Sequence, residues 1–126
     1  FIPSLVSGIS DLDYYATRLS VNAEVYQAKK DEVTIGYVAF YANNKNEKIA
    51  FITQIAVKKE QQSMGLGRKL ITIAEKKSLE IGMESIELEV FLDNPRALEF
   101  YKRSGYEYLK SEKENSSIIM SKKLHK

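Results

Sequence analysis

The stretch Gln62-Ser63-Met64-Gly65-Leu66-Gly67-Arg68 decides the fold, because it joins a segment with strand character to a segment with helical character. Its two glycines let the backbone turn tightly, so successive N–H groups can converge on one point. The helix that starts here adds the partial positive charge of its first turn. The loop therefore predicts a site for an anion such as a pyrophosphate, with Arg68, Lys58 or Lys59 as added positive charge. A Gly-x-Gly turn before a helix is also a common structural connector, so the loop alone leaves both interpretations open.

Two better-known phosphate-binding motifs do not fit this loop. A Walker loop continues with Gly-Lys-Ser/Thr, which does not follow here. The dinucleotide fingerprint requires a third glycine three residues after the second, and Leu70 stands at that position. A nucleotide-binding domain of either kind is therefore not predicted.

The segments before the loop are rich in Val, Ile, Tyr, Phe and Thr, which favour strands. They cover residues 24–29, 33–41 and 48–57, and short polar turns separate them. We therefore predict an antiparallel meander of three strands. Ahead of it, Ser10 is placed to cap a first helix that runs to about residue 22. The apolar residues of this helix share one face: Leu12, Tyr15, Ala16, Leu19 and Ala23.

The segments after the loop predict a helix and then a strand. The helix ends at Gly82, a natural C-terminal stop. It carries an apolar stripe with one lysine on its flank, formed by Leu66, Leu70, Ala74, Ile81 and Lys77. In residues 86–91, Ile, Leu and Val alternate with Glu and Phe, which is the period of a strand.

A second helix is predicted after residues 86–91. Asp93 and Asn94 cap it, Pro95 occupies its first position, and Gly105 ends it. Its inward face is formed by apolar and aromatic residues, namely Ala97, Leu98, Phe100 and Tyr101. Its charged residues are expected to point away, namely Arg96, Glu99, Lys102 and Arg103.

Taken in order, these elements predict an α/β protein in which helices cover a mixed sheet. Residues 106–109 and 118–120 are predicted as two closing strands, joined by a charged turn. The chain of 126 residues is short enough to form one domain over residues 1–126.

The composition excludes several classes of function. The chain has no cysteine and one histidine, His125, so thiolate catalysis, a catalytic triad and a histidine metal cluster are excluded, and no metal is predicted. Lys and Arg (19) nearly balance Asp and Glu (17), and no basic block predicts nucleic-acid binding. No apolar run approaches the ~18 residues that a membrane span requires. No signal peptide is recognisable, so we expect a cytoplasmic protein.

Two stretches of the chain resemble the GNAT superfamily of N-acetyltransferases. Ile55-Ala56-Val57 followed by Gln62-x-x-Gly65-x-Gly67 is similar to the acetyl-CoA signature of that family. Its second conserved stretch is matched in order and spacing by Leu88-Glu89-Val90, Asn94, Ala97, Phe100-Tyr101 and Gly105-Tyr106. The resemblance covers residues 49–109 and implies a fold in which two central parallel strands splay apart and acetyl-CoA fills the wedge.

The resemblance also implies roles for particular residues. Ile55 and Val57 would offer backbone groups to the pantetheine arm, residues 62–67 would wrap the pyrophosphate, and Asn94 would contact the cofactor. The residues predicted to bind acetyl-CoA are Ile55, Ala56, Val57, Gln62, Ser63, Met64, Gly65, Leu66, Gly67, Arg68 and Asn94. The family usually has a strand before its first helix, which is either residues 2–7 here or is missing from this chain.

Catalysis requires a proton acceptor and a proton donor. An alkyl ammonium with a pKa near ~10 is mostly charged at neutral pH, so a base must take its proton. Glu89 is the predicted base, and a chain of water molecules is the alternative. Some family members carry a glutamate four residues before the Ile55 position, where this chain has Phe51. Tyr101 occupies the position of the family's usual general acid, and the backbone N–H of Val57 is a candidate oxyanion donor.

The sequence therefore predicts an acetyl-CoA-dependent N-acetyltransferase that acts by direct attack of a primary amine of a small molecule or peptide. The alternative is a non-catalytic acyl-CoA-binding module, which would keep the glycine loop but could dispense with Tyr101 and Glu89. We expect no nucleic acid and no membrane as partner. The choice between a monomer and a homodimer stays open, as does the identity of the acceptor amine.

Overall fold

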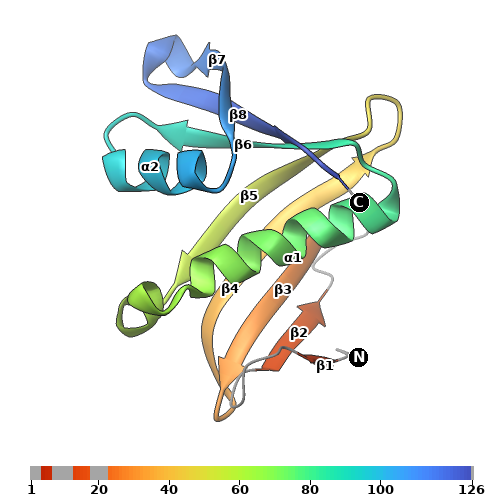
Figure 1. Cartoon of the computed structure of the whole chain (residues 1–126), viewed down its shortest axis with the longest axis vertical. Coiled ribbons are helices and arrows are strands. Elements are labelled where there is room, and N and C mark those ends of the chain that lie inside the picture. Colours follow the sequence, from red (N-terminus) through yellow and green to blue (C-terminus); the bar gives the residue numbers. More distant parts are fainter. Residues whose placement is uncertain (1–3, 7–12, 18–22, 126) are drawn as a thin grey trace.

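The computed structural model describes residues 4–6, 13–17 and 23–125 of the chain. Their strands form one mixed sheet in the order β1-β2-β3-β4-β5-β6-β8-β7 (Figure 1). The predicted meander is confirmed as β3 (Ala23–Lys30), β4 (Val33–Asn44) and β5 (Ile49–Val57). Each of these strands pairs antiparallel with the next.

The predicted first helix is wrong over the part of it that the structure describes. Asp13–Thr17 form a strand, β2, which pairs antiparallel with β3 and with β1 (Ser4–Val6). The apolar spacing in this segment fits a helix, but Tyr14, Tyr15 and Thr17 are residues that favour strands, and pairing with β3 overrides the local pattern. The cap at Ser10 and the end near residue 22 lie outside the described residues. Strand β1 falls within residues 2–7, where one of our two alternatives placed a strand.

The glycine loop connects β5 to the long helix, as predicted. A short 3₁₀ turn, η1 (Lys59–Met64), leads to Gly65, whose φ of 76° is in the left-handed region. Helix α1 (Leu66–Ile81) starts directly after it and ends at Gly82, whose N–H bonds to carbonyls of the last turn. The helix buries Leu66, Leu70, Ile71, Ala74 and Ser78. Ile81, predicted in the buried stripe, is 44% exposed, because Ser78 occupies the buried face of the last turn instead.

The two central parallel strands separate, which creates the wedge that positions the site. Strand β6 (Ser85–Phe91) pairs parallel with β5 only from Ile49↔Ser85 to Ile52↔Leu88. Beyond that point β5 runs on to Val57 and β6 to Phe91 without pairing to each other. The backbone groups of both strands that face the gap are therefore open to a ligand.

The second helix and the closing strands complete the sheet. Helix α2 (Pro95–Arg103) begins at Asn94, whose side-chain oxygen accepts a hydrogen bond from the N–H of Ala97 at 3.1 Å, as predicted for a cap. Strands β7 (Glu107–Glu112) and β8 (Ser117–Lys123) are longer than predicted, and a 3₁₀ turn, η2 (Lys113–Asn115), joins them. Strand β8 pairs with β6, which leaves β7 at the edge.

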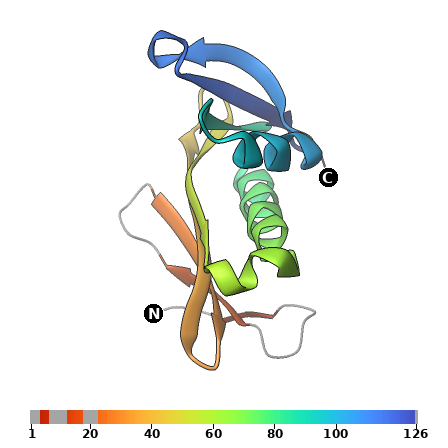
Figure 2. The ribbon, with the colours of Figure 1, turned by 90° about the vertical axis from the view of Figure 1, so that its left-hand side faces the viewer.

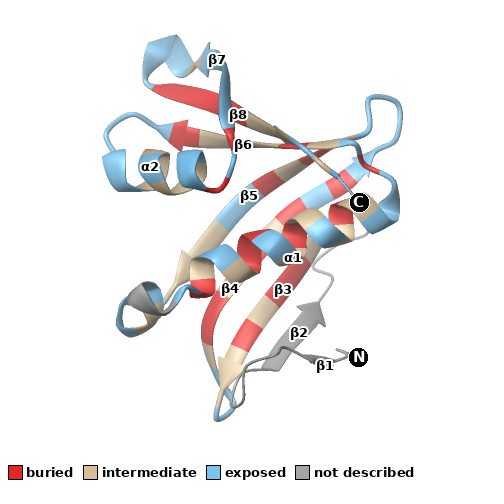
Figure 3. Cartoon of the chain, viewed as in Figure 1, coloured by how far each residue is buried: buried red, intermediate tan, exposed pale blue. Residues whose placement is uncertain are grey.

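The hydrophobic core lies between α1 and the strands β3 to β6 and β8 (Figure 3). Glycine is required at Gly36 of β4, because a Cβ there would lie 3.0 Å from the carbonyl oxygen of Ala56 and 3.1 Å from Leu66. Helices α1 and α2 lie on the same side of β5 (Figure 2).

Candidate active site

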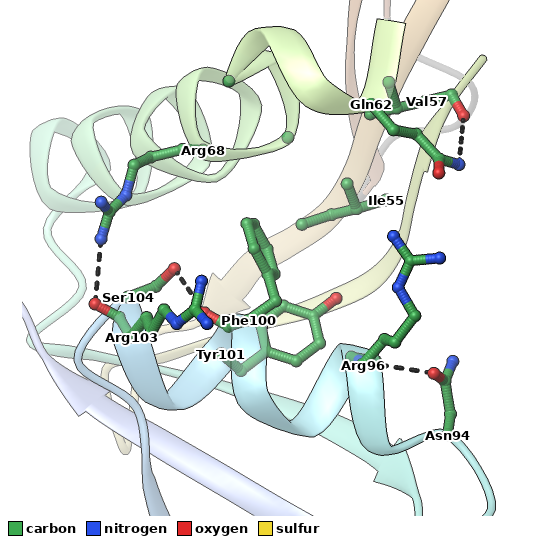
Figure 4. Close-up of a pocket in the computed structure, with 13 residues that line it drawn as sticks. Ile55, Val57, Gln62, Arg68, Asn94, Arg96, Phe100, Tyr101, Arg103 and Ser104 are labelled. Atoms are coloured by element: carbon green, nitrogen blue, oxygen red, sulfur yellow. Dashed lines mark hydrogen bonds between the residues drawn. The ribbon is translucent and has the colours of Figure 1, made fainter. Parts of the chain in front are cut away.

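A cleft of about 550 Å³ lies between the end of β5, the start of α1 and α2 (Figure 4). It brings together residues from separate parts of the sequence, from Ile55 to Ser104, as the resemblance implied. The residues that line it are Ile55, Val57, Gln62, Gly65, Gly67, Arg68, Asn94, Arg96, Ala97, Phe100, Tyr101, Arg103 and Ser104.

The start of α1 supplies free N–H donors to the cleft. The first bond within the helix runs from the N–H of Lys69 to the carbonyl of Gly65 at 3.2 Å, so the N–H groups of residues 66–68 have no partner in the helix. No side chain caps this end of α1. A Cβ at Gly65 would meet no atom within 4 Å, so the backbone is open to a ligand there. Free N–H groups at a helix start suit a phosphate.

The backbone of β5 offers a second set of hydrogen-bonding groups. The N–H of Lys58 donates to the carbonyl of Ile35 at 2.8 Å, so the adjacent Gly36↔Val57 pair is a non-hydrogen-bonded pair of the ladder. The peptide groups of Val57, and of Ile55 two residues before it, therefore point away from β4 and into the gap toward β6. Gln62 already uses this opening, because its side-chain nitrogen donates to the carbonyl of Val57 at 3.3 Å.

Four of the residues predicted to bind acetyl-CoA are not among those that line the cleft: Ala56, Ser63, Met64 and Leu66. The peptide group of Ala56 points the other way, toward β4, and its carbonyl oxygen lies against Gly36. Leu66 is buried in the core, so only its backbone N–H is available at the start of α1. The side chains of Ser63 and Met64 lie outside the described residues.

Three arginines line the cleft, and two of them, Arg96 and Arg103, were predicted to lie on the outward face of α2. The structure corrects that expectation, since Arg96 and Arg103 line the cleft together with Arg68. Arg68 donates from its Nη2 to the carbonyl of Arg103 at 2.9 Å. The Nε of Arg103 forms an ion pair with Oε1 of Glu99 at 3.4 Å. Arg96 makes no ion pair with any described residue, and Figure 4 shows it directed across the cleft toward Gln62. The cleft therefore has the positive charge that phosphates require.

Tyr101 lies inside the cleft on α2, at the position where the family resemblance implied a proton donor. Its ring forms T-shaped pairs with Phe100 and Tyr106, at 5.2 Å and 6.0 Å between ring centres. No described residue shares a hydrogen bond with its hydroxyl group, which Figure 4 shows on the Ile55 side of the cleft. Burial raises the pKa of Tyr101 above its usual value, because the phenolate would lose solvation. Tyr101 is thus protonated at neutral pH.

Glu89 is not among the residues that line the cleft. It lies on the face of β6 opposite to the buried Leu88, as the first residue beyond the last pair of the parallel ladder. Its carboxylate accepts a hydrogen bond from the Oγ of Ser117 at 2.6 Å and lies 3.6 Å from the Nζ of Lys113. Glu89 lies where the gap between β5 and β6 begins, but no contact in the structure tests whether it acts as a base. That role stays a prediction.

These donors fit coenzyme A, which presents phosphates, amide groups and a thiol along one extended molecule. Free N–H groups and arginines match the phosphates, and the peptide groups of Ile55 and the N–H of Val57, which face the gap, match the amides. Among the described residues no group of three or more His, Asp or Glu could hold a metal ion. Within the same residues, no helix is long and apolar enough to cross a membrane.

The chain belongs to the GNAT acetyltransferase family. The sequence profile of the family described as "Acetyltransferase (GNAT) family" matches residues 4–106. An uncharacterized N-acetyltransferase of Methanocaldococcus jannaschii is 34% identical over 77 residues. That match covers 58% of this chain but only 34% of the relative, so the chain spans about a third of the length of that curated protein.

Solved structures show the same fold. The PaiA N-acetyltransferase of Thermoplasma acidophilum, solved in complex with coenzyme A, has a TM-score of 0.74 and 24% identity, and the match covers 81% of this chain and 61% of that one. A GNAT family acetyltransferase of Elizabethkingia anophelis with acetyl-CoA bound has a TM-score of 0.77 and 14% identity. That match covers 92% of this chain and 100% of the other. The fold predicted from the resemblance is thereby confirmed.

Proposed function

We propose that the protein transfers the acetyl group of acetyl-CoA to a primary amine of a small molecule or peptide by direct attack. The observation that carries this proposal is the cleft, in which the free N–H groups of α1, the open peptide groups of β5 and the Tyr101 hydroxyl lie along one path. Two related folds bind coenzyme A or acetyl-CoA, which supports the choice of acyl donor. The alternative is a non-catalytic acyl-CoA-binding module. Amine-dependent release of coenzyme A distinguishes the enzyme from such a module.

Acetyl-CoA supplies an activated thioester carbonyl when it is bound. In the net reaction the amine nitrogen forms a bond to the acetyl carbon, the bond from that carbon to sulfur breaks, and the products are an acetamide and the free thiol of coenzyme A. In this proposal the N–H of Val57, which faces the gap, donates to the acyl oxygen. Tyr101 holds the proton that the leaving sulfur takes up. Glu89, directly or through water, takes the proton that the amine loses.

A panel of amines tests the proposed function. We expect release of coenzyme A thiol from acetyl-CoA to depend on the amine, with mass spectrometry showing one acetyl group on the acceptor. The panel includes amino acids, polyamines, amino sugars and peptides with a free N-terminus. Tight binding of acetyl-CoA with no amine-dependent thiol release across the panel would favour the binding module instead.

Arg96 is expected to attract the phosphates of the acyl donor. Arg96→Ala should weaken binding of acetyl-CoA by about 10-fold. This is the lower end of the range for a hydrogen bond to a charged group, and we expect the lower end because Arg96 is exposed to solvent. The difference from wild type should shrink as salt is added. Lys102→Ala is the matched control, since Lys102 is an exposed cation of the same helix that does not line the cleft. Calorimetric titrations that give equal losses for both variants would remove Arg96 from the site.

Glu89 is expected to accept the proton of the amine. Glu89→Gln should lower turnover about 10²-fold at neutral pH and recover partly as the pH approaches ~10, where the amine arrives deprotonated. The control is Glu87→Gln, because Glu87 lies two residues earlier on the same face of β6 but pairs with Phe51 inside the ladder. A pH profile of turnover that is unchanged in Glu89→Gln would assign the base to water or to another residue.

A further inference from the structure

A partly buried polar cluster at the C-terminal end of α2 is used by none of the steps above. Glu75 of α1, Lys122 of β8 and Tyr106, which follows α2, meet there, and we call these three residues the α2 anchor. The Nζ of Lys122 lies 3.2 Å from both carboxylate oxygens of Glu75. The hydroxyl of Tyr106 donates to Oε2 of Glu75 at 2.9 Å. The side chains of Lys122 and Glu75 are 30% and 15% exposed and Tyr106 is 2% exposed, so these contacts are partly shielded from water.

The α2 anchor holds the C-terminal end of α2 directly. Lys122 also donates to the carbonyl of Ser104, the residue that caps this end, at 2.8 Å. A cation at the last carbonyls of a helix is favourable, because the helix dipole is negative there. The close approach depends on Gly105, since its φ is 97° and a Cβ there would lie 3.3 Å from Cε of Lys122.

Apolar packing alone does not fix the position of α2. None of its residues is fully buried, and the helix is only 9 residues long. From the cleft side, Arg68 binds the carbonyl of Arg103, so cations from two other elements hold consecutive carbonyls at this end of the helix. Ala97, Leu98, Phe100 and Tyr101 pack against the core without being fully buried, and the polar contacts at the C-terminus add a second constraint on the helix that carries Tyr101.

The α2 anchor reaches Tyr101 through Tyr106. The N–H of Tyr106 donates to the carbonyl of Tyr101 at 3.0 Å, and the two rings meet edge to face at 6.0 Å. Burial, and then the negative charge of Glu75, raise the pKa of Tyr106 far above its usual value, so its hydroxyl stays a donor to Glu75.

We propose that Glu75, Tyr106 and Lys122 are positioning residues that hold the hydroxyl of Tyr101 at the place where it donates its proton. This inference rests on the proposed function, because it gives Tyr101 the role of the acid. The residues act through Tyr101 and touch neither substrate. A displacement of a catalytic group by about 1 Å can cost up to about 10²-fold in rate, so loosening one end of α2 has a measurable effect.

The test is a double-mutant cycle between Tyr106→Phe and Tyr101→Phe, measured as kcat with both substrates saturating. Tyr106→Phe removes one hydroxyl group and keeps the ring contact, and it should lower kcat about 10-fold with little change in KM for acetyl-CoA. In the Tyr101→Phe background the same change should lower kcat by less than about 2-fold, because no hydroxyl remains to be positioned. Equal losses in both backgrounds, or no loss in the wild-type background, would overturn the proposal.

A second readout does not depend on activity. Protein labelled at the tyrosine ζ carbons gives an NMR resonance for Tyr101, which its absence in Tyr101→Phe identifies. Tyr106→Phe and Glu75→Gln should both shift this resonance, whereas Glu80→Gln should not, because Glu80 forms only an exposed ion pair with Lys77 on the same helix. If Glu75→Gln does not fold, Tyr106→Phe decides alone, and an unmoved resonance contradicts the proposal. If the wild-type protein acetylates no amine, the proposed function fails while the resonance still decides whether the α2 anchor positions Tyr101.

Discussion

Tyr101→Phe should lower kcat by roughly 10²–10⁴, the usual effect of a positioned proton donor. The substitution removes one hydroxyl and keeps the ring that contacts Phe100 and Tyr106, so packing should hardly change. The affinity for acetyl-CoA should stay the same within about 2-fold, since a loss confined to turnover marks an interaction made only in the transition state. Steady-state kinetics with a saturating acceptor, paired with a cofactor titration, measure both quantities.

The pH profile of the wild-type enzyme gives this prediction a second part. Because burial raises the pKa of Tyr101, its proton is retained as the pH rises through the usual value of 10.0 for a tyrosine. A loss of kcat from ionisation of Tyr101 should thus appear only above that pH and be absent in the phenylalanine variant. The control variant is Tyr108→Phe, which removes a hydroxyl from a tyrosine of β7 that is 62% exposed and outside the cleft. Near-normal turnover in Tyr101→Phe would exclude Tyr101 as the acid and leave it a packing residue.

Gly65→Val should abolish binding of acetyl-CoA. The wild-type protein at a ligand concentration about 100 times Kd should gain roughly 2.7 kcal/mol, which raises Tm by on the order of 10 °C. The valine side chain would occupy open space at the start of α1, where nothing lies within 4 Å of the Cβ position. It would block the approach of a phosphate to the free N–H groups, so the shift in Tm should vanish.

A matched control separates blocked binding from a weakened fold. Valine at position 65 also strains the backbone, because a β-branched residue is unfavourable at the φ of 76° found there. Gly82→Val introduces a similar strain at the other end of α1, where φ is 113° and the Cβ position is also open. Both variants should have a lower Tm without ligand, but only Gly82→Val should keep the shift with acetyl-CoA. An undiminished shift in Gly65→Val would place the phosphates elsewhere.

The elements that the sequence predicted correctly are those whose signals are local. Asn94 followed by Pro95 specifies the start of α2, and alternation in residues 86–91 specifies β6. The splay of β5 and β6 came from the resemblance, because no local pattern reports where two distant strands stop pairing. The helix predicted near the N-terminus was wrong because strand pairing with a distant segment also leaves no local pattern. Tyr15 fits the apolar spacing of a helix, but it pairs with Gln27 of β3.

The cleft was predicted in part. Gln62, Gly65 and Arg68 came from the loop motif, whereas Arg96 and Arg103 were assigned to the outward face of α2 together with its other charged residues. A signal was present in the sequence. Arg96 and Arg103 are seven residues apart, so they share one helix face at two-turn spacing, as Asn94 and Tyr101 do.

Long-range polar partners had no sequence signal at all. The hydrogen bond from Ser117 to Glu89 and the meeting of Glu75, Tyr106 and Lys122 join residues from different elements. Such contacts depend on how the elements pack, which periodicity and capping patterns do not encode. They emerge only when the strands and helices are placed in space.

The most direct test of the central claim is a crystal structure of the protein with coenzyme A. We predict that the pyrophosphate lies within hydrogen-bond distance of the N–H groups of residues 66–68, and that the pantetheine arm bonds the peptide groups of Ile55 and the N–H of Val57. We also predict that the sulfur lies next to the hydroxyl of Tyr101. A structure in which coenzyme A occupies another surface, or in which its phosphates lie away from the start of α1, would show that this cleft is not the acetyl-CoA site.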